Sequence, residues 1–181
     1  STIMLARGLL GGTVIQNRVP LSQISPALMR AVIASEDGNF CRHRGVDWGA
    51  IDEALDQAAE SGGRPRGAST ISMQTVKNLL LWPQQHYLRK LLEIPLAYTA
   101  EKAWGKPRIL ELYLNIAEWG PGIFGAEAAA RHYFRKSAQN LSPREAALLA
   151  VTLPAPLARN PARPSPATLP VARGIEIRAA R

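Results

Sequence analysis

The chain has 181 residues, 46% of them hydrophobic, and a net charge of +8 from 22 Lys and Arg against 14 Asp and Glu. This composition excludes a disordered tail, and we expect one mainly helical domain over residues 1–181, with two lobes around a cleft. The charge favours a polyanionic partner: phosphate groups, nucleic acid or an acidic membrane surface. The single Cys41 excludes an intramolecular disulfide and a metal site built from several thiolates.

No run of residues approaches the roughly 18 uninterrupted apolar positions that span a bilayer, and the start lacks the pattern of a signal peptide. The first ten residues are nevertheless rich in apolar side chains. We expect these to pack at the edge of the core or to dip into an anionic bilayer surface, with two arginines near them. The residues concerned are Ile3, Met4, Leu5, Leu9 and Leu10, with Arg7 and Arg30.

Capping signals predict the first three helices. Ser25, followed by proline, opens a helix over residues 26–36, and Asp47 opens a second that ends at Gly62–Gly63. Ser69 or Thr70 caps a third helix, which runs to Trp82 before a proline. The periodic apolar residues in these segments indicate helices rather than strands.

Prolines organise the second half of the chain. A helix over residues 87–102 contains Pro95, which should kink it or divide it, and Pro107 starts a helix that ends at Ile116. The sequence from Ser142 to Glu145 is a capping box before an apolar helix over residues 146–153. Six prolines then predict an irregular wrapping segment at about 154–170, followed by a short piece over residues 171–181.

Four short clusters carry the candidate chemistry: residues 36–45, residues 67–74 with Lys77, residues 89–93 and residues 106–115. The first places Glu36 and Asp37 at a helix end, where partial burial would shift a carboxyl pKa. Taken singly, each cluster also has a structural interpretation: Glu36 as a solvated helix-end acid, His43 as a hydrogen-bonded loop residue, Thr70 as a helix cap. Arg89 and Glu93, four residues apart, would then form a surface ion pair.

Taken together and in order, the clusters resemble the motifs of the peptidoglycan glycosyltransferases, the monofunctional transglycosylases and the polymerase domain of bifunctional penicillin-binding proteins. The resemblance runs from about residue 20 to residue 162. The amino-acid sequence of residues 116–125 most resembles that of the monofunctional enzymes. The matching residues are Glu36, Asp37, Phe40, His43 and Gly45; Gly67, Ser69, Thr70, Ile71, Gln74 and Lys77; Arg89, Lys90 and Glu93; and Ile109, Leu110, Glu111, Tyr113, Leu114 and Asn115.

The resemblance implies a lysozyme-like fold and polymerisation of lipid II. The acceptor's GlcNAc 4-hydroxyl attacks the anomeric carbon of a glycan carried on a lipid pyrophosphate, giving a β-1,4 bond with inversion. It implies Glu36 as the general base and Glu93 as the second catalytic carboxylate, near the leaving pyrophosphate. The implied substrate-binding residues are Asp37, Phe40, His43, Ser69, Thr70, Gln74, Lys77, Arg89, Lys90 and Asn115.

Further expectations follow from the same resemblance. The pyrophosphate charge would be neutralised by Lys77, Arg89 and Lys90 or by a divalent cation, Mg²⁺ or Mn²⁺, which Glu93 could hold through the pyrophosphate. The partners would be lipid II, the lipid-linked nascent glycan, an anionic membrane surface and other cell-wall synthesis proteins, but not nucleic acid. The protein would act at the periplasmic face of the bacterial inner membrane. The N-terminal transmembrane anchor of family members is expected to be absent from this chain.

Two departures from the family pattern put substrate contacts in question. Met73 stands where the family has the first glutamine of a pair, and methionine cannot donate the same hydrogen bonds. Gln85 stands in a link where family members often carry an arginine.

Two other functions stay open from the sequence. A lysozyme-like muramidase would use Glu36 as a general acid, but would leave Lys77 and the cluster around Glu93 without a purpose. A non-catalytic basic module would bind nucleic acid or anionic lipid through the net charge.

Overall fold

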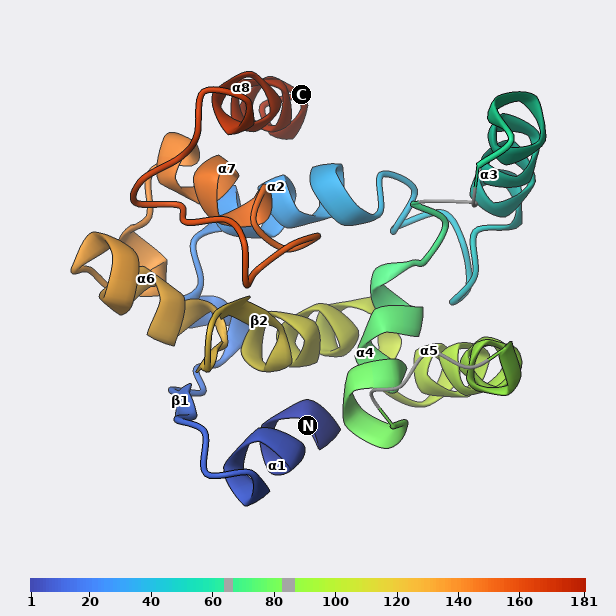
Figure 1. Cartoon of the computed structure of the whole chain (residues 1–181), viewed down its shortest axis with the longest axis horizontal. Helices are drawn as coiled ribbons and strands as arrows, with labels where there is room; N and C mark the ends of the chain where they lie inside the picture. Colours follow the sequence, from blue (N-terminus) through green and yellow to red (C-terminus); the bar gives the residue numbers. More distant parts are fainter. Residues whose placement is uncertain (64–66, 83–86) are drawn as a thin grey trace.

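The computed structural model describes residues 1–63, 67–82 and 87–181 (Figure 1). It is mainly helical, which confirms the predicted fold class. No helix in these ranges combines the length and apolar character needed to cross a bilayer. The helices are α1 (Thr2–Leu9), α2 (Pro26–Glu36), α3 (Trp48–Ser61), α4 (Ile71–Leu80), α5 (Tyr87–Ile116), α6 (Ala126–Phe134), α7 (Pro143–Ala150) and α8 (Thr168–Ala179).

The predicted caps are confirmed. Ser25 Oγ accepts a hydrogen bond from the backbone N–H of Ala27, with proline at N1 of α2, and Asp47 caps α3. Gly62 ends α3 in the left-handed conformation, at φ 65°. Thr70, rather than the preceding serine, caps α4, and Ser142 forms both hydrogen bonds of the capping box at α7.

The break in α5 falls at Gly105 and not at Pro95. Helical backbone continues through Pro95, whereas Gly105 has φ 70° and ψ 165°, a conformation open mainly to glycine. Pro107 then lies in the first turn of the second part, where a missing backbone N–H costs little. The chain direction changes at Gly105, so that Lys106 and the residues after it pack in a new direction.

The C-terminal predictions need two corrections. The helix that follows Ser142 ends at Ala150, and residues 151–154 form turns. Pro170 does not belong to the irregular segment, because α8 begins at Thr168 and places this proline in its first turn, where no intrahelical donor is required. The residues between α7 and α8 are irregular, as their prolines predict.

A small sheet that the sequence pattern does not predict joins distant parts of the chain. Strand β1 (Ile15–Gln16) pairs in parallel with β3 (Ile123–Phe124), which pairs antiparallel with β2 (Glu118–Gly120). The strands are two or three residues long, too short for an alternating pattern to show.

Buried apolar side chains form two main groups, consistent with the predicted lobes. The larger group joins α2, α6, α7, α8 and the second part of α5 around Leu28, Leu114, Trp119 and Leu149. The smaller group joins the start of α3 to α4 and the first part of α5. It contains Val46, Met73, Val76, Ala97 and Ala100.

The N-terminal apolar residues divide between the two expected roles. Met4 is buried and packs with Phe124 and Ile116, and Ile3 lies partly buried beside them. Leu9 and Leu10 are each 87% exposed and Leu5 is 68% exposed.

Of the two arginines expected near these leucines, Arg7 lies there, lining a hollow with Leu10, and Arg30 does not. Arg7 forms an ion pair with Glu118. Arg30 donates to the carbonyl of Ala179 in α8, at the opposite end of the molecule from α1 (Figure 1).

Candidate active site

Glu36 is the last residue of α2 and lies at the edge of a hollow. Its Oε2 accepts a hydrogen bond of 3.2 Å from Gln74 Nε2, and its Oε1 accepts one of 3.3 Å from Ser35 Oγ. Burial raises the pKa of Glu36, although these two hydrogen bonds and the charge of Lys77 lower it in part. The carboxyl group is therefore partly dry, as its place at a helix end predicts.

Gln74 is oriented by a buried tyrosine. Tyr113 OH donates to Gln74 Oε1 over 3.2 Å, so the amide nitrogen faces Glu36 and the backbone carbonyl of Ser69. Burial raises the pKa of Tyr113 well above its ordinary value, which keeps the phenol protonated and able to donate. Tyr113 and Gln74 thus hold one oxygen of Glu36 from the side of α4 and α5.

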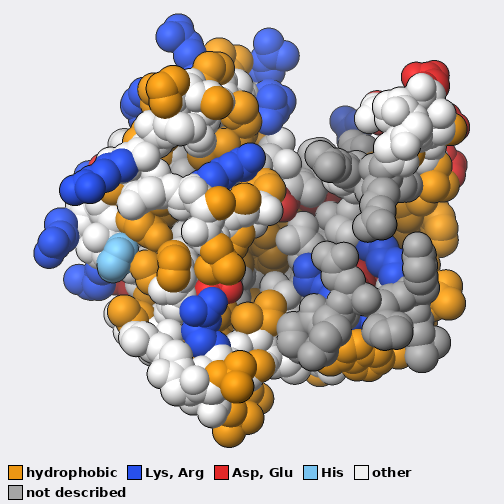
Figure 2. Space-filling model, in the orientation of Figure 1, with side chains coloured by type: hydrophobic (Ala, Val, Ile, Leu, Met, Phe, Trp, Pro, Cys, Tyr) orange, Lys and Arg blue, Asp and Glu red, His pale blue; other side chains and the backbone are white. Residues whose placement is uncertain are grey.

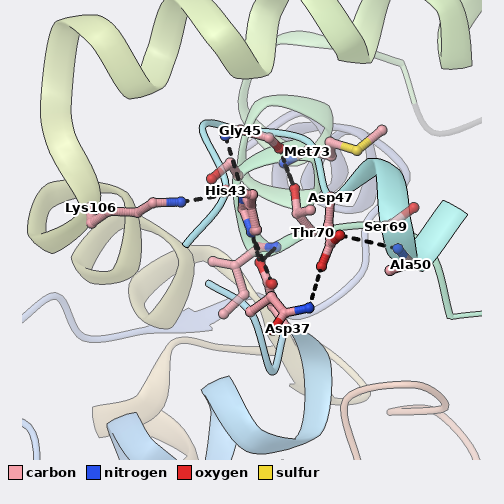
Figure 3. Close-up of polar contacts among 12 residues, drawn as sticks. Asp37, His43, Gly45, Asp47, Ala50, Ser69, Thr70, Met73 and Lys106 are labelled. Carbon is pink, nitrogen blue, oxygen red and sulfur yellow. Dashed lines mark hydrogen bonds and ion pairs between the residues drawn. The ribbon is translucent and has the colours of Figure 1, made fainter. Parts of the chain in front are cut away.

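Asp37, Phe40 and His43 form a buried group that follows Glu36 in the chain, and Figure 3 shows His43 directed at Asp37. His43 Nε2 is 3.0 Å from both oxygens of Asp37, and Asp37 Oδ2 also accepts the backbone N–H of Ile71 at the start of α4. The Phe40 ring is 2% exposed and packs edge-on against His43. Phe40 is thus placed in the core and not at the surface of the hollow.

The hollow beside Glu36 has a volume of about 320 Å³. Thr70 lies at its wall, but its hydroxyl is occupied: it donates to the carbonyl of Gly45 and accepts from Met73 N. Ser69 instead presents its hydroxyl to Lys90. The lining residues are Ser35, Glu36, Asp37, Gly38, Asn39, Asp47, Ala50, Gly67, Ala68, Ser69 and Thr70.

Glu93 is 2% exposed and surrounded by cations, so it does not form the surface ion pair that its spacing from Arg89 also allowed. Lys90 Nζ lies 3.1 Å from Glu93 Oε2 and 2.7 Å from Ser69 Oγ, which links α5 to the wall of the hollow. Arg89 lies 3.6 Å from Glu93 Oε1. In the described part of the chain, Glu93 Oε1 and Arg89 Nε are buried without a hydrogen-bond partner.

Lys77 connects the two carboxylates electrostatically. Burial lowers its pKa, whereas the charges of Glu93 and, more weakly, Glu36 raise it. Arg89 and Lys90 add to the lowering through like-charge repulsion. The site therefore combines Glu36 with a second, more cationic centre around Glu93.

The structure does not bring Asn115 into this site. Its side chain accepts from Val19 N and donates to the carbonyls of Val19 and Glu111, which fixes the segment before α2. Asn115 lines a separate hollow together with Arg18 and Arg108.

The two departures from the family pattern have different outcomes. Met73 is fully buried in the smaller apolar group, so this side chain faces away from the hollow, and Gln74 supplies the amide beside Glu36. Gln85 lies outside the described residues.

Lys106, Glu101 and Ser72 also belong to the buried polar network, although the sequence did not mark them as site residues. Lys106 Nζ contacts Glu101 Oε1 and lies 3.3 Å from His43 Nδ1, and Ser72 Oγ donates to the same Glu101 oxygen. Lys106 is the first residue of the fourth sequence cluster, and this position was the one signal in the sequence that it belongs near the site. Glu101 lies in the interior of a helix and in none of the clusters, so the sequence contained no signal for it.

Comparison with known proteins tests the resemblance. The family model described as Transglycosylase matches residues 8–174. A biosynthetic peptidoglycan transglycosylase of Brucella suis biovar 1 is 54% identical over 181 residues, which is all of this chain and 80% of that protein. Proteins of the same description from Rhodospirillum centenum and Pasteurella multocida are 54% and 55% identical, over 91% and 89% of this chain and 71% and 65% of their own lengths.

The expected family and enzyme class are confirmed by this match, which extends well beyond the motifs on which the expectation was based. The chain belongs to the transglycosylase family.

Proposed function

We propose that the chain polymerises lipid II into glycan strands, with Glu36 as the base that activates the acceptor. The peptidoglycan glycosyltransferase activity follows from the family, and the residue roles are inferred from the site. One observation carries the assignment: Glu36 and Ser69 line the same hollow, and Ser69 accepts a hydrogen bond from Lys90, which pairs with the buried Glu93. The proposed base, Glu36, and the proposed pyrophosphate site around Glu93 are therefore separate but adjacent.

Glu36 suits the removal of a proton from a hydroxyl group. A raised pKa makes the ionised carboxylate a stronger base, while the hydrogen bond from Gln74 keeps one oxygen fixed. In the proposed step Glu36 takes the proton of the acceptor's GlcNAc 4-hydroxyl as its oxygen bonds to the donor's anomeric carbon. The bond from that carbon to the pyrophosphate oxygen breaks, and the pyrophosphate leaves with the electron pair.

The surroundings of Glu93 suit the departing pyrophosphate. Lys77, Arg89 and Lys90 supply three cations against one carboxylate, so the centre attracts an anion despite Glu93. The carboxylate holds Lys90 and Arg89 in place, since a close opposite charge stabilises both. Arg89 Nε is a buried donor without a partner among the described residues, and a phosphate oxygen would satisfy it.

A divalent cation is a further proposal at this centre. No group of three or more His, Cys, Asp or Glu within the described residues is arranged to hold a metal. Glu93 Oε1 is a buried oxygen without a hydrogen-bond partner there, and Mg²⁺ commonly binds one carboxylate together with substrate phosphates. Glu93 thus fits as one ligand of a Mg²⁺ or Mn²⁺ ion that would neutralise phosphate charge when bound.

Polymerisation of purified lipid II tests the function. We expect wild-type protein to form glycan strands and Glu36→Gln to reduce the rate by about 100-fold to 10,000-fold, the range for loss of a general base. Glu53→Gln, at an exposed position of α3, is the matched control and should keep the activity. Repeating the assay with Mg²⁺, Mn²⁺ or a chelator tests the metal.

Other outcomes would contradict the proposal. A folded wild-type protein that makes no glycan strands but releases soluble muropeptides from sacculi would be a muramidase. Salt-sensitive binding of DNA without any turnover of lipid II would indicate a basic binding module.

The location follows in part from the family. Peptidoglycan synthesis takes place in the cell envelope, and we propose the inner membrane, at its periplasmic face, as the location; the lipid-linked substrates support the membrane. An anionic membrane surface and other cell-wall synthesis proteins are the proposed partners. The exposed leucines of α1 and the net charge of +8 support the membrane surface.

A further inference from the structure

A partly buried chain of polar contacts connects the second part of α5 with the residue next to Glu36 (Figure 3). It runs from Lys106 through His43 to Asp37, and Asp37 accepts the first backbone N–H of α4 from Ile71. The side chains of His43 and Asp37 are 6% and 2% exposed. Nothing in the proposed proton transfer uses Lys106, which does not line the hollow.

The contacts at His43 determine where its proton lies. Nδ1 is 3.1 Å from the backbone nitrogen of Gly45 and 3.3 Å from Lys106 Nζ. A backbone N–H and an ammonium group can only donate, so Nδ1 must accept. Nε2, which faces the Asp37 carboxylate, therefore carries the ring's proton. The imidazole is neutral in this arrangement, even though an acid lies against it.

Lys106 is held at Nδ1 by three groups. Its ammonium pairs with Glu101 and lies 4.4 Å from the centre of the Phe40 ring, a cation–π distance. Gly105 directs it inward, because the helix changes direction at that residue. The charged groups around His43 are Asp37, Lys106 with Glu101 behind it, and Asp47 near the start of α3.

A neutral His43 leaves the charge of Asp37 uncompensated by its nearest neighbour. That negative charge is one of the interactions that raise the pKa of Glu36. An imidazolium at the same place would cancel part of it, and would also repel Lys106.

We infer that Lys106 is a positioning residue for the proposed glycosyl transfer: together with the Gly45 N–H, its ammonium keeps His43 in the neutral, Nε2-protonated tautomer, and His43 in turn fixes the Asp37 carboxylate beside Glu36. Lys106 touches neither substrate nor reacting atoms in this account. The role in catalysis rests on the proposed function, whereas the tautomer does not.

Nitrogen-15 NMR of the imidazole rings in the folded chain of residues 1–181 tests the tautomer directly. Three histidines are present, and loss of one set of signals in His43→Gln assigns the ring. We expect wild-type His43 to show an acceptor-type Nδ1 and a protonated Nε2 at pH 7. Two protonated nitrogens at pH 7, or a proton on Nδ1, would overturn the inference without requiring any variant of Lys106.

Lys106→Met tests the link to the reaction. We expect His43 to exchange between tautomers, because only the Gly45 N–H still donates to Nδ1 in this variant. The kcat of glycan synthesis should fall about 10-fold to 100-fold, the scale of a small misplacement, with little change in KM. Lys106→Arg, which keeps the charge, should recover part of kcat and the wild-type tautomer. Lys102→Met, at an exposed position of the same helix, is the control and should match wild type.

The two failures are distinguishable. Lys106→Met with wild-type kcat and tautomer would overturn the positioning role while leaving lipid II polymerisation intact. A wild-type protein that does not polymerise lipid II would remove the proposed function, and the NMR result would still report on the tautomer.

Discussion

Glu36 shows how a single residue can favour chemistry at the expense of stability. Burial disfavours its ionised form and raises its pKa, and the hydrogen bonds from Gln74 and Ser35 recover only part of that cost. A carboxylate placed only for stability would be solvated or paired directly with a cation. Here the environment leaves a stronger base, as proton abstraction requires.

The raised pKa predicts a pH-dependent effect of Glu36→Gln on stability. A group whose pKa is raised on folding stabilises the fold at low pH, and this contribution is lost as pH rises from the ordinary value of 4.5 through the raised value. The variant cannot ionise. Its free energy of unfolding in urea should therefore exceed that of wild type at pH 7, and the difference should shrink toward pH 4.

Glu145→Gln provides a control of opposite sign. Slight burial raises the pKa of Glu145, but hydrogen bonds from Ser142 and the charge of Lys136 outweigh it and lower the pKa overall. Its contribution is therefore present above the ordinary value of 4.5 and is lost as pH falls through the lowered one. This variant should be less stable than wild type at pH 7. If Glu36→Gln were also destabilising at pH 7, the dry environment of Glu36 would be wrong.

At the scale of elements, the loop between α2 and α3 is fixed by close backbone packing. Gly45 has φ 101°, and a Cβ atom there would lie 2.9 Å from the carbonyl carbon and oxygen of Ala97 in α5. Gly45 also donates to His43 and accepts from Thr70. Because glycine has no side chain, the loop that carries His43, the partner of Asp37, can pack directly against the backbone of α5.

Gly45→Ala should therefore destabilise the fold and weaken the site together. The left-handed conformation alone costs alanine about 1–3 kcal/mol, and the contact with Ala97 adds to it. Urea unfolding measures the loss. Gly49→Ala, in the first turn of α3, should be neutral or stabilising by about 0.5–1 kcal/mol, because alanine favours helix and its Cβ has room. Equal stability of the two variants would contradict the packing argument.

The elements differ in how far the sequence predicts them. Helices opened by Ser25, Asp47, Thr70 and Ser142 were predictable because a cap and its helix are neighbours in the chain. The break in α5 was placed at a proline, since the turn at Gly105 depends on packing that no local pattern reveals. The pairing of β1 with β3 joins residues that are far apart in the chain, such as Ile15 and Ile123, and leaves no local signal.

The same contrast holds for the site. The shared motifs indicated Glu36, Glu93 and most of their neighbours, but a motif does not say which way a side chain points. Phe40 and Asn115 hold the fold together, and Met73 faces the core. The contact between Lys106 and His43 spans 63 residues and required the folded chain.

At the scale of the whole molecule, the site depends on both lobes. Glu36 ends a helix of the larger apolar group, and Glu93 lies in the first part of α5, which belongs to the smaller one. Lys90 of α5 reaches Ser69 in the segment before α4. The two centres of the proposed reaction therefore meet only when the lobes are packed together.

Charge and apolar surface are also distributed unevenly over the molecule. Figure 2 shows Lys and Arg side chains around α6, α7 and α8, and hydrophobic side chains on α1 at the lower edge. Helix α1 is joined to the end of α4 by Thr2, whose hydroxyl donates to the carbonyl of Leu81. Leu80 and Trp82, on either side of that residue, are also exposed. Exposed apolar side chains of α1 and of the end of α4 thus belong to neighbouring parts of the surface.

This surface predicts binding to anionic vesicles through α1. Replacing both Leu9 and Leu10 by Ser removes side chains that are 87% exposed, so the fold should persist, while vesicle binding should weaken about 10-fold or more. Sedimentation with phosphatidylglycerol vesicles measures it. Leu157→Ser, at a 63% exposed position between α7 and α8, should bind as wild type does. Equal losses in both variants would contradict a role for α1, because binding would then reflect general surface hydrophobicity.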